Sequence, residues 1–183
     1  FTNNIWDAPA PMRVIAVGNS FWNIVLSLRP HLLRNFSAHA QPMVALIDTD
    51  FWSVRTIVED GHQYWRTWFR YDSKYDVFPI FVPIYQDAVL TDNYKKTLKM
   101  QFIQVRRWAW GVTDVAYFAN QAFFKKNNIP LHKRLSKSFR LLEGHLSWST
   151  SSFLLLLAAY PVFFFHTSSD IFGTAYLANE IPQ

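Results

Sequence analysis

The sequence predicts an α/β fold, mainly helical with a few strands, followed by an interface helix and one transmembrane helix. Half of the 183 residues are apolar and 18% are aromatic, which is enough to bury a core and excludes a disordered chain. Apolar residues recur at helical spacing over much of the chain, whereas residues 75–82 form a short apolar run with prolines, typical of a strand. A last apolar run, residues 148–165, carries no charge.

The first part of the chain predicts two helices joined by an extended segment. Apolar spacing indicates an amphipathic helix over residues 12–28, which Pro30 ends. Small residues at 36–40 favour a short extended segment. A proline early in residues 41–47 suits the first turn of a short helix.

The middle of the chain predicts a helix and then a strand. Glu59 and Asp60 suit the positive end of a helix dipole, so we expect a helix to begin there and to run over residues 59–69. Residues 75–82 follow as a strand. Prolines within and directly after this run mark it as an edge strand, or as one that ends early.

The last part predicts long helices and a membrane span. Thr91 suits the N-cap of a helix over residues 92–121, and the basic stretch 129–143 is typical of a helix lying along a membrane surface. All 18 Lys and Arg lie at or before Arg140, so the positive-inside rule places residues 1–143 in the cytoplasm. With its Ser and Thr flank, the last apolar run reaches the roughly 20 residues that a span needs. The alternative is a buried hairpin or core helix of a soluble protein.

Composition also excludes some classes of function. The chain has no Cys, which excludes disulfides, thiolate metal sites and catalysis by Cys. Net charge is +5, but the basic residues do not form a stripe interleaved with aromatics, so we expect no nucleic-acid partner. The six His show no metal-ligand spacing, and His62 is interpreted as structural.

One helical turn carries groups suited to a phosphate-activated sugar. Gln104, Arg107 and Trp108 are spaced i, i+3 and i+4. A guanidinium binds phosphate, an indole offers a platform for a sugar ring, and an amide orients both. The acidic pair Glu59 and Asp60 supplies the proton acceptor that those groups lack. The alternative is that Arg107 forms a surface ion pair and Trp108 packs in the core.

The order of these motifs resembles the processive, cellulose-synthase-like branch of family 2 glycosyltransferases. That family has Thr-Glu-Asp, then Gln-x-x-Arg-Trp, then an amphipathic basic piece and a membrane span. This chain has Val58-Glu59-Asp60 and Gln104-x-x-Arg107-Trp108, and the resemblance covers about residues 36–165. Residues 37–40 stand where the family has a small-residue strand lining the donor site. The resemblance implies the C-terminal half of a GT-A-like α/β domain.

The resemblance also implies a role for each motif residue. Asp60 is the candidate general base, which takes the proton of an acceptor hydroxyl as its oxygen attacks the anomeric carbon and inverts it. Arg107 stabilises the leaving diphosphate, Trp108 stacks on the acceptor sugar, and Gln104 orients these groups. Glu59 is a supporting, structural neighbour.

Two departures from the family pattern matter. Val58 replaces the usual Thr. The nucleotide-binding half and its metal-binding Asp-x-Asp are missing, so we expect the chain to be a fragment that is inactive alone. A divalent cation, Mg or Mn, is expected in the full protein, with its ligands outside this chain. Asp48-Thr49-Asp50 has the pattern but is interpreted as a helix end and turn; a metal site there is the alternative.

The predicted division of the chain has four parts: residues 1–124, a partial catalytic domain; 125–145, an amphipathic interface segment; 146–166, the transmembrane helix; 167–183, an extracytoplasmic loop. The expected partners are a nucleotide-sugar donor, a saccharide or lipid-linked acceptor and the lipid bilayer. The expected location is the inner membrane, multi-pass in the full protein, with the catalytic part cytoplasmic. The alternative function is a non-catalytic, membrane-anchored structural or scaffold subunit.

Overall fold

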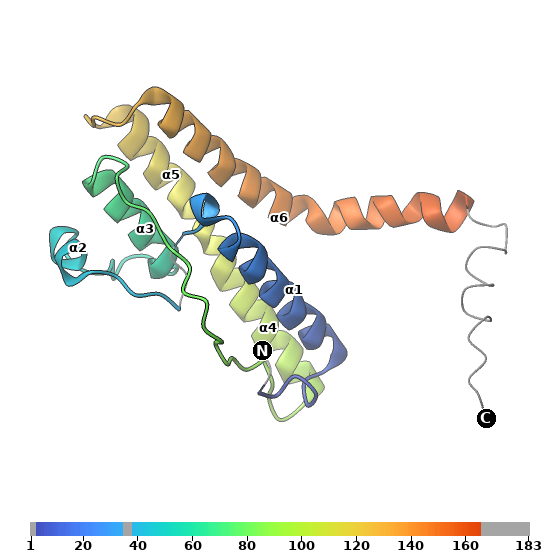
Figure 1. The fold of residues 1–183 in the computed structure, drawn as a ribbon. Helices are drawn as coiled ribbons and strands as arrows, with labels where there is room; N and C mark the ends of the chain where they lie inside the picture. Colours follow the sequence, from blue (N-terminus) through green and yellow to red (C-terminus); the bar gives the residue numbers. More distant parts are fainter. Residues whose placement is uncertain (1–2, 35–37, 166–183) are drawn as a thin grey trace, which may run out of the picture. The chain divides into compact units, whose positions relative to one another are not determined.

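A computed structural model describes residues 3–34 and 38–165, in which the regular secondary structure is helical (Figure 1). The elements are α1 (Ala10–Ser27), η1 (Pro30–Leu32), α2 (Met43–Asp48), α3 (Glu59–Arg70), α4 (Tyr94–Ala109), η2 (Trp110–Val112), α5 (Thr113–Ala119), η3 (Asn120–Phe124) and α6 (Leu131–Phe165). Helices α4 and α5 continue one another through η2, whose caps are also helical, and η3 is a single π-helical stretch.

The predicted α/β fold is wrong for the described part of the chain, which contains no strand. The segment predicted as a strand, residues 75–82, has extended backbone but forms no strand. Tyr75 and Val77 are half-buried, while its other apolar side chains are mostly exposed, Phe78 by 78%. A strand needs a hydrogen-bonding neighbour, and Pro79 and Pro83 withhold two backbone donors here. The other extended prediction, residues 36–40, lies partly outside the described residues, and residues 38–40 form no strand.

The predicted transmembrane helix is also corrected. Residues 131–165 form one continuous helix, α6, which runs through both the predicted interface segment and the predicted span. Within the described residues, no helix combines the length and apolarity that a bilayer crossing requires. The physical reason lies in the sequence: the apolar stretch 153–165 is short for hydrocarbon, and the polar run Ser-Trp-Ser-Thr-Ser-Ser precedes it. Residues 166–183, predicted to complete the span and form a loop, lie outside the described part.

The chain divides into two compact units, Phe1–Ser138 and Phe139–Gln183. The described part of the second unit is the remainder of α6, in which hydroxyls bond back to the helix; Thr150, for example, donates to the carbonyl of Leu146 at 2.7 Å. The first unit holds every candidate site residue.

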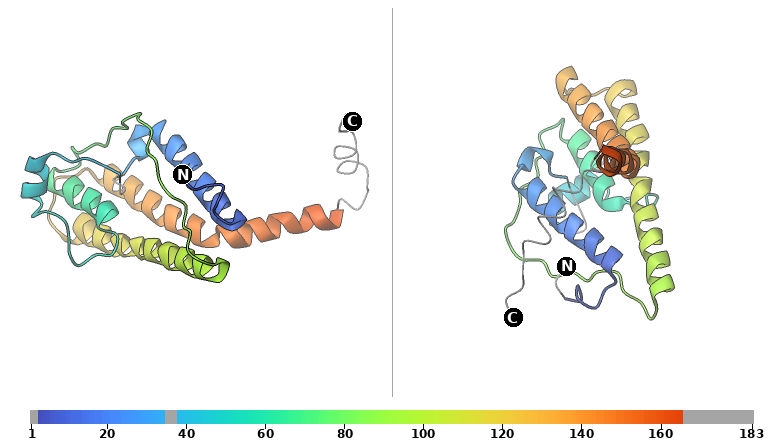
Figure 2. Two further views of the ribbon diagram at one scale, coloured as in Figure 1. Left: turned by 90° about the horizontal axis from the view of Figure 1, so that it is seen from below. Right: turned by 90° about the vertical axis from the view of Figure 1, so that its right-hand side faces the viewer.

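An aromatic core joins α3 to α5. Trp65 and Trp68 of α3 pack on Phe118 of α5 with ring centroids 4.9 and 5.7 Å apart, and all three are buried. Tyr64 contacts Trp65 edge-on at 4.9 Å. Figure 1 and both views of Figure 2 show the two helices side by side. Aromatic pairs in this geometry add to the free energy gained by burial, so this contact is the main packing interaction of the first unit.

A second, smaller core fastens α1 to the segment before α4. Ala8, Met12 and Ala16 are buried together with Ala88. The amide of Asn4 clamps the backbone of Ala88: its Nδ2 donates to the carbonyl at 2.9 Å, and its Oδ1 accepts from the N–H at 2.7 Å. This exchange resembles a strand bridge made by one side chain, and it fixes the path of the extended segment.

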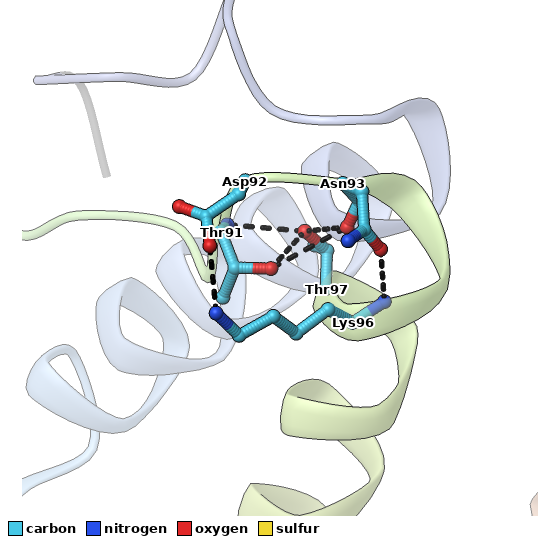
Figure 3. A network of polar contacts seen from close by, with 5 residues as sticks. All are labelled: Thr91, Asp92, Asn93, Lys96 and Thr97. Atoms are coloured by element: carbon cyan, nitrogen blue, oxygen red, sulfur yellow. Dashed lines mark hydrogen bonds and ion pairs between the residues drawn. The ribbon is translucent and has the colours of Figure 1, made fainter.

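The start of α4 differs from the prediction by two residues. Asn93, not Thr91, is the N-cap, and its side chain accepts from the N–H of Lys96 at 2.9 Å (Figure 3). The hydroxyl of Thr91 instead forms a hydrogen bond with the hydroxyl of Thr97 at 3.0 Å. The backbone N–H of Thr91 also donates to Oγ1 of Thr97. Asp92 pairs with Lys96 at 2.7 Å on the exposed surface. The predicted helix 92–121 is therefore confirmed in its course, while its cap is corrected.

Replacing Trp65 with Ala removes the centre of the aromatic core. Because the side chain is buried and close-packed, we expect the free energy of unfolding to fall by about 3–5 kcal/mol. Trp6→Ala is the matched control, since that indole is 81% exposed and should change stability by less than about 0.5 kcal/mol. Urea unfolding followed by circular dichroism measures both. Equal losses in the two variants would contradict this placement of the core.

Burial raises the pKa of Tyr64 to about 12. The folded state therefore favours the neutral phenol, and its contribution to stability is complete below the unfolded pKa of about 10 and is lost as the pH rises to about 12. Between pH 10 and pH 12, we expect the free energy of unfolding of Tyr64→Phe to fall by about 2–3 kcal/mol less than that of the natural protein. Unfolding free energies at pH 9 and pH 12 test this expectation. Tyr94→Phe, which removes the hydroxyl of a tyrosine that is 53% exposed, is the matched control variant.

Candidate functional site

The first turn of α3 carries the two predicted acids. Glu59 is exposed and Asp60 half-buried, and both lie at the positive end of the helix as predicted. Oδ1 of Asp60 accepts from the N–H of Gly61 at 2.7 Å. Its Oδ2 makes no hydrogen bond with any described residue, so this oxygen is available to accept a proton.

A buried bond joins this turn to α5. Nδ1 of His62 lies 2.6 Å from Oδ1 of Asp114, and both side chains are almost fully buried. The ring of Tyr117 meets the imidazole edge-on, with centroids 4.4 Å apart. Gly61 also lies close, since a Cβ added there would be 3.8 Å from Oδ2 of Asp114. The start of α3 therefore rests directly on the start of α5.

The Gln-x-x-Arg-Trp residues divide between two faces of α4. Gln104 and Trp108 line a small cavity of about 30 Å³, closed by Met12 and Ala16 of α1 and by the clamped Ala88. Asp60 is not among the lining residues. Trp108 remains 37% exposed.

Arg107 lies away from that cavity on the exposed side of α4. It makes no hydrogen bond or ion pair with the described residues. Consecutive residues of a helix point about 100° apart, so Arg107 and Trp108 cannot both face α1. Of the three residues spaced i, i+3 and i+4, only Gln104 and Trp108 line the cavity beside α1.

Helix continuity relates the two halves of the candidate site. Asp114 follows Trp108 by six residues, a rise of roughly 9 Å along the helix axis. Because Gly61 lies against Asp114, Asp60 lies beside the start of α5, whereas Arg107 and Trp108 lie about two helical turns earlier along the α4–α5 rod. Among the described residues, no hydrogen bond or ion pair joins Asp60 to Arg107 or Trp108.

Asp48-Thr49-Asp50 forms the end of α2 and a turn, as predicted. Asp50 has a left-handed backbone with φ of 54°. Arg66 of α3 donates to the carbonyls of Thr49 and Phe51, which ties the turn to α3. Oδ2 of Asp48 accepts from the hydroxyl of Tyr71 at 2.7 Å, which raises the pKa of that tyrosine.

The divalent cation implied by the resemblance finds no matching ligand set in the described part of the chain. No group of three or more His, Asp or Glu side chains converges there. Asp48 is engaged by Tyr71, and the Thr49 hydroxyl accepts from Nε2 of Gln63 at 2.8 Å. No step of the chemistry below is therefore assigned to a metal ion.

Sequence reasoning missed Asp114. Its position carries a signal, because Asp114, Phe118 and Ala122 follow one another at i, i+4 and i+8, and all three are buried. A carboxylate in line with a buried apolar stripe requires a partner, which His62 supplies.

A second missed feature is a polar hollow of about 340 Å³ at the far end of α3. Its lining residues are Phe69, Asp72, Gln121, Lys126, Asn127 and Asn128. Most of its polar groups bond to each other: Asp72 accepts from the N–H of Asn128 at 3.2 Å, and Nδ2 of Asn127 donates to the carbonyl of Gln121 at 2.9 Å. These bonds close the π-helical end of η3, which gives the hollow a structural explanation.

The chain matches no protein-family model, no curated protein and no solved structure.

Proposed function

We propose that this chain carries the acceptor-side residues of an inverting glycosyltransferase that uses a nucleotide-sugar donor. The observation that carries the proposal is the His62–Asp114 bond, because it joins the acidic turn of α3 to α5, which continues α4, the helix that bears Arg107 and Trp108. The saccharide acceptor, the divalent cation and the inner-membrane location stay predictions of the resemblance.

The separation of the two halves suits the chemistry. In a direct displacement, the acceptor oxygen attacks the anomeric carbon from the face opposite the departing diphosphate. The base and the phosphate-binding group must therefore stand apart by the width of the sugar that reacts between them. Asp60 and Arg107 form no ion pair with each other among the described residues, and a salt bridge between them would engage both groups before any substrate arrived.

The proposed reaction has one step. Oδ2 of Asp60 takes the proton of the acceptor hydroxyl while the hydroxyl oxygen forms a bond to the anomeric carbon. The bond from that carbon to the diphosphate breaks, and the electron pair leaves with the nucleoside diphosphate. The exposed guanidinium of Arg107 stabilises the charge that grows on the leaving group, and configuration at the carbon inverts.

A non-catalytic structural subunit is the second candidate. The observation that favours it is the cavity beside α1, where Gln104 and Trp108 pack with Met12 and Ala16. In that alternative the indole is a packing group, and the acids of α3 serve its helix dipole.

Asp60→Asn tests the base. We expect sugar transfer to fall by about 100- to 10,000-fold, because the amide cannot take the proton. The protein expressed from its natural gene is assayed with radiolabelled uridine and guanosine diphosphate sugars, and released nucleoside diphosphate is counted. Asp76→Asn, which changes an exposed carboxylate of the extended segment, is the control and keeps full transfer. Full transfer by Asp60→Asn would contradict the proposed base and favour the non-catalytic structural subunit.

Arg107→Ala tests the phosphate contact against its neighbour. We expect transfer to fall by about 100- to 1,000-fold, because one charge-stabilising group is lost. Arg106→Ala is matched in type, exposure and helix position, and it should retain transfer within about twofold. The same assay applies to both. Equal losses in the two variants would point to general charge effects on α4 and against a specific role for Arg107.

A further inference from the structure

The His62–Asp114 pair is an unusual anchor for the start of a helix. The N-cap of α3 is Val58, which offers no side-chain acceptor to the first turn, although the N–H of Gly61 donates to Oδ1 of Asp60. Hydrogen bonds from a cap therefore do not hold this turn in place. A buried side-chain bond to another helix does so instead.

We propose that His62 and Asp114 form a positioning pair, which holds Asp60 at a fixed distance from Arg107 and Trp108. This inference rests on the proposed function. It assigns the pair no contact with substrate, and it predicts that the pair acts on the reaction through the placement of Asp60.

The first argument is local geometry. His62 lies two residues after Asp60 within the same turn, so any displacement of the imidazole moves the carboxylate as well. Its Nδ1 is 2.6 Å from Asp114, and Tyr117 contacts the ring edge-on, so two groups of α5 hold the imidazole. Gly61 brings the backbone itself close to the same carboxylate.

The second argument is where the other end of the bond lies. Asp114 belongs to the first turn of α5, which continues from α4 through η2. Arg107 and Trp108 stand on the last turn of α4. The pair therefore connects the proposed base to the same helical rod that carries the proposed phosphate and sugar contacts.

The third argument is energetic. Burying a carboxylate is unfavourable unless it is paired and hydrogen-bonded, and Asp114 is 4% exposed. An apolar pair of similar volume would fill the same space without that cost. What the polar pair adds is direction, since a short bond fixes both distance and orientation, and misplacing a reacting group by about 1 Å can reduce a rate by about 100-fold.

The experiment compares three variants in the protein expressed from its natural gene. Asp114→Ala removes the acceptor. Asp114→Asn keeps an oxygen that accepts from Nδ1–H of His62 and removes the charge. Asp92→Ala is the matched control, because it breaks a carboxylate–cation bond of nearly equal length, 2.7 Å, on the exposed surface of α4 (Figure 3). Each variant is first shown by its unfolding midpoint to be folded at the assay temperature.

Two quantities are measured: kcat and KM for transfer from the nucleotide sugar used above, and amide hydrogen exchange across residues 59–65. We expect Asp114→Ala to lower kcat by about 100-fold with the donor KM nearly unchanged, and to speed exchange in the first turn of α3. Asp114→Asn should recover kcat to within about tenfold of the natural protein. Asp92→Ala should alter neither quantity.

The outcomes separate the pair from the function. Folded Asp114→Ala with natural kcat, or Asp114→Asn as impaired as Asp114→Ala, would overturn the positioning pair while leaving transfer by Asp60 in place. Transfer that persists in Asp60→Asn would overturn the proposed function itself. Loss of kcat together with faster exchange in α3, and recovery of both in Asp114→Asn, is the result that the positioning pair requires.

Discussion

The contact between α3 and α5 determines where the chemically competent residues of the first unit lie. Trp65 and Trp68 pack on Phe118, and this apolar contact sets the distance between the two helices. The bond from His62 to Asp114 adds a short, directional contact at one end of the same interface. At this interface, the buried rings set the spacing of the two helices, and the hydrogen bond fixes the start of α3 against α5.

A similar division applies on the other side of α3. Gln63 is fully buried, yet its amide is used to reach the Thr49 hydroxyl, while Arg66 binds the carbonyls on either side of Asp50. The α2 turn is therefore attached by polar groups of α3 and not by an apolar core. Such attachments are sensitive to geometry, and they explain why an acidic turn that resembles a metal motif serves here as a packing element.

Local features of the sequence predicted much of the fold. The helix at 59–69 was predicted to within one residue, because an acidic start and an amphipathic pattern are both local signals. The strand at 75–82 was wrong because a strand depends on a partner that its own residues cannot specify. The predicted transmembrane helix was also wrong. A membrane span must be apolar over its whole length, and the Ser-rich residues before the apolar stretch of α6 lower its mean hydropathy.

The candidate site was predicted in part. Spacing placed Gln104 and Trp108 on one face, and they share a cavity. Spacing could not reveal that α1 covers the face shared by Gln104 and Trp108, nor that Arg107 lies outside that contact. The partner of His62 was also missed, because 52 residues separate it from Asp114 and only the folded chain brings the two together.

The extended segment before α4 has a consequence for how molecules of this chain meet. Exposed apolar side chains on unpaired backbone invite edge-to-edge association between copies. Pro79 and Pro83 leave only three residues between them, and the N–H of Val82 is already used by the carbonyl of Ile80 at 2.9 Å. A second chain aligned here would find its hydrogen-bonding register broken at every few residues. The segment can thus present an apolar surface to another molecule, while its prolines prevent it from forming an intermolecular β-sheet.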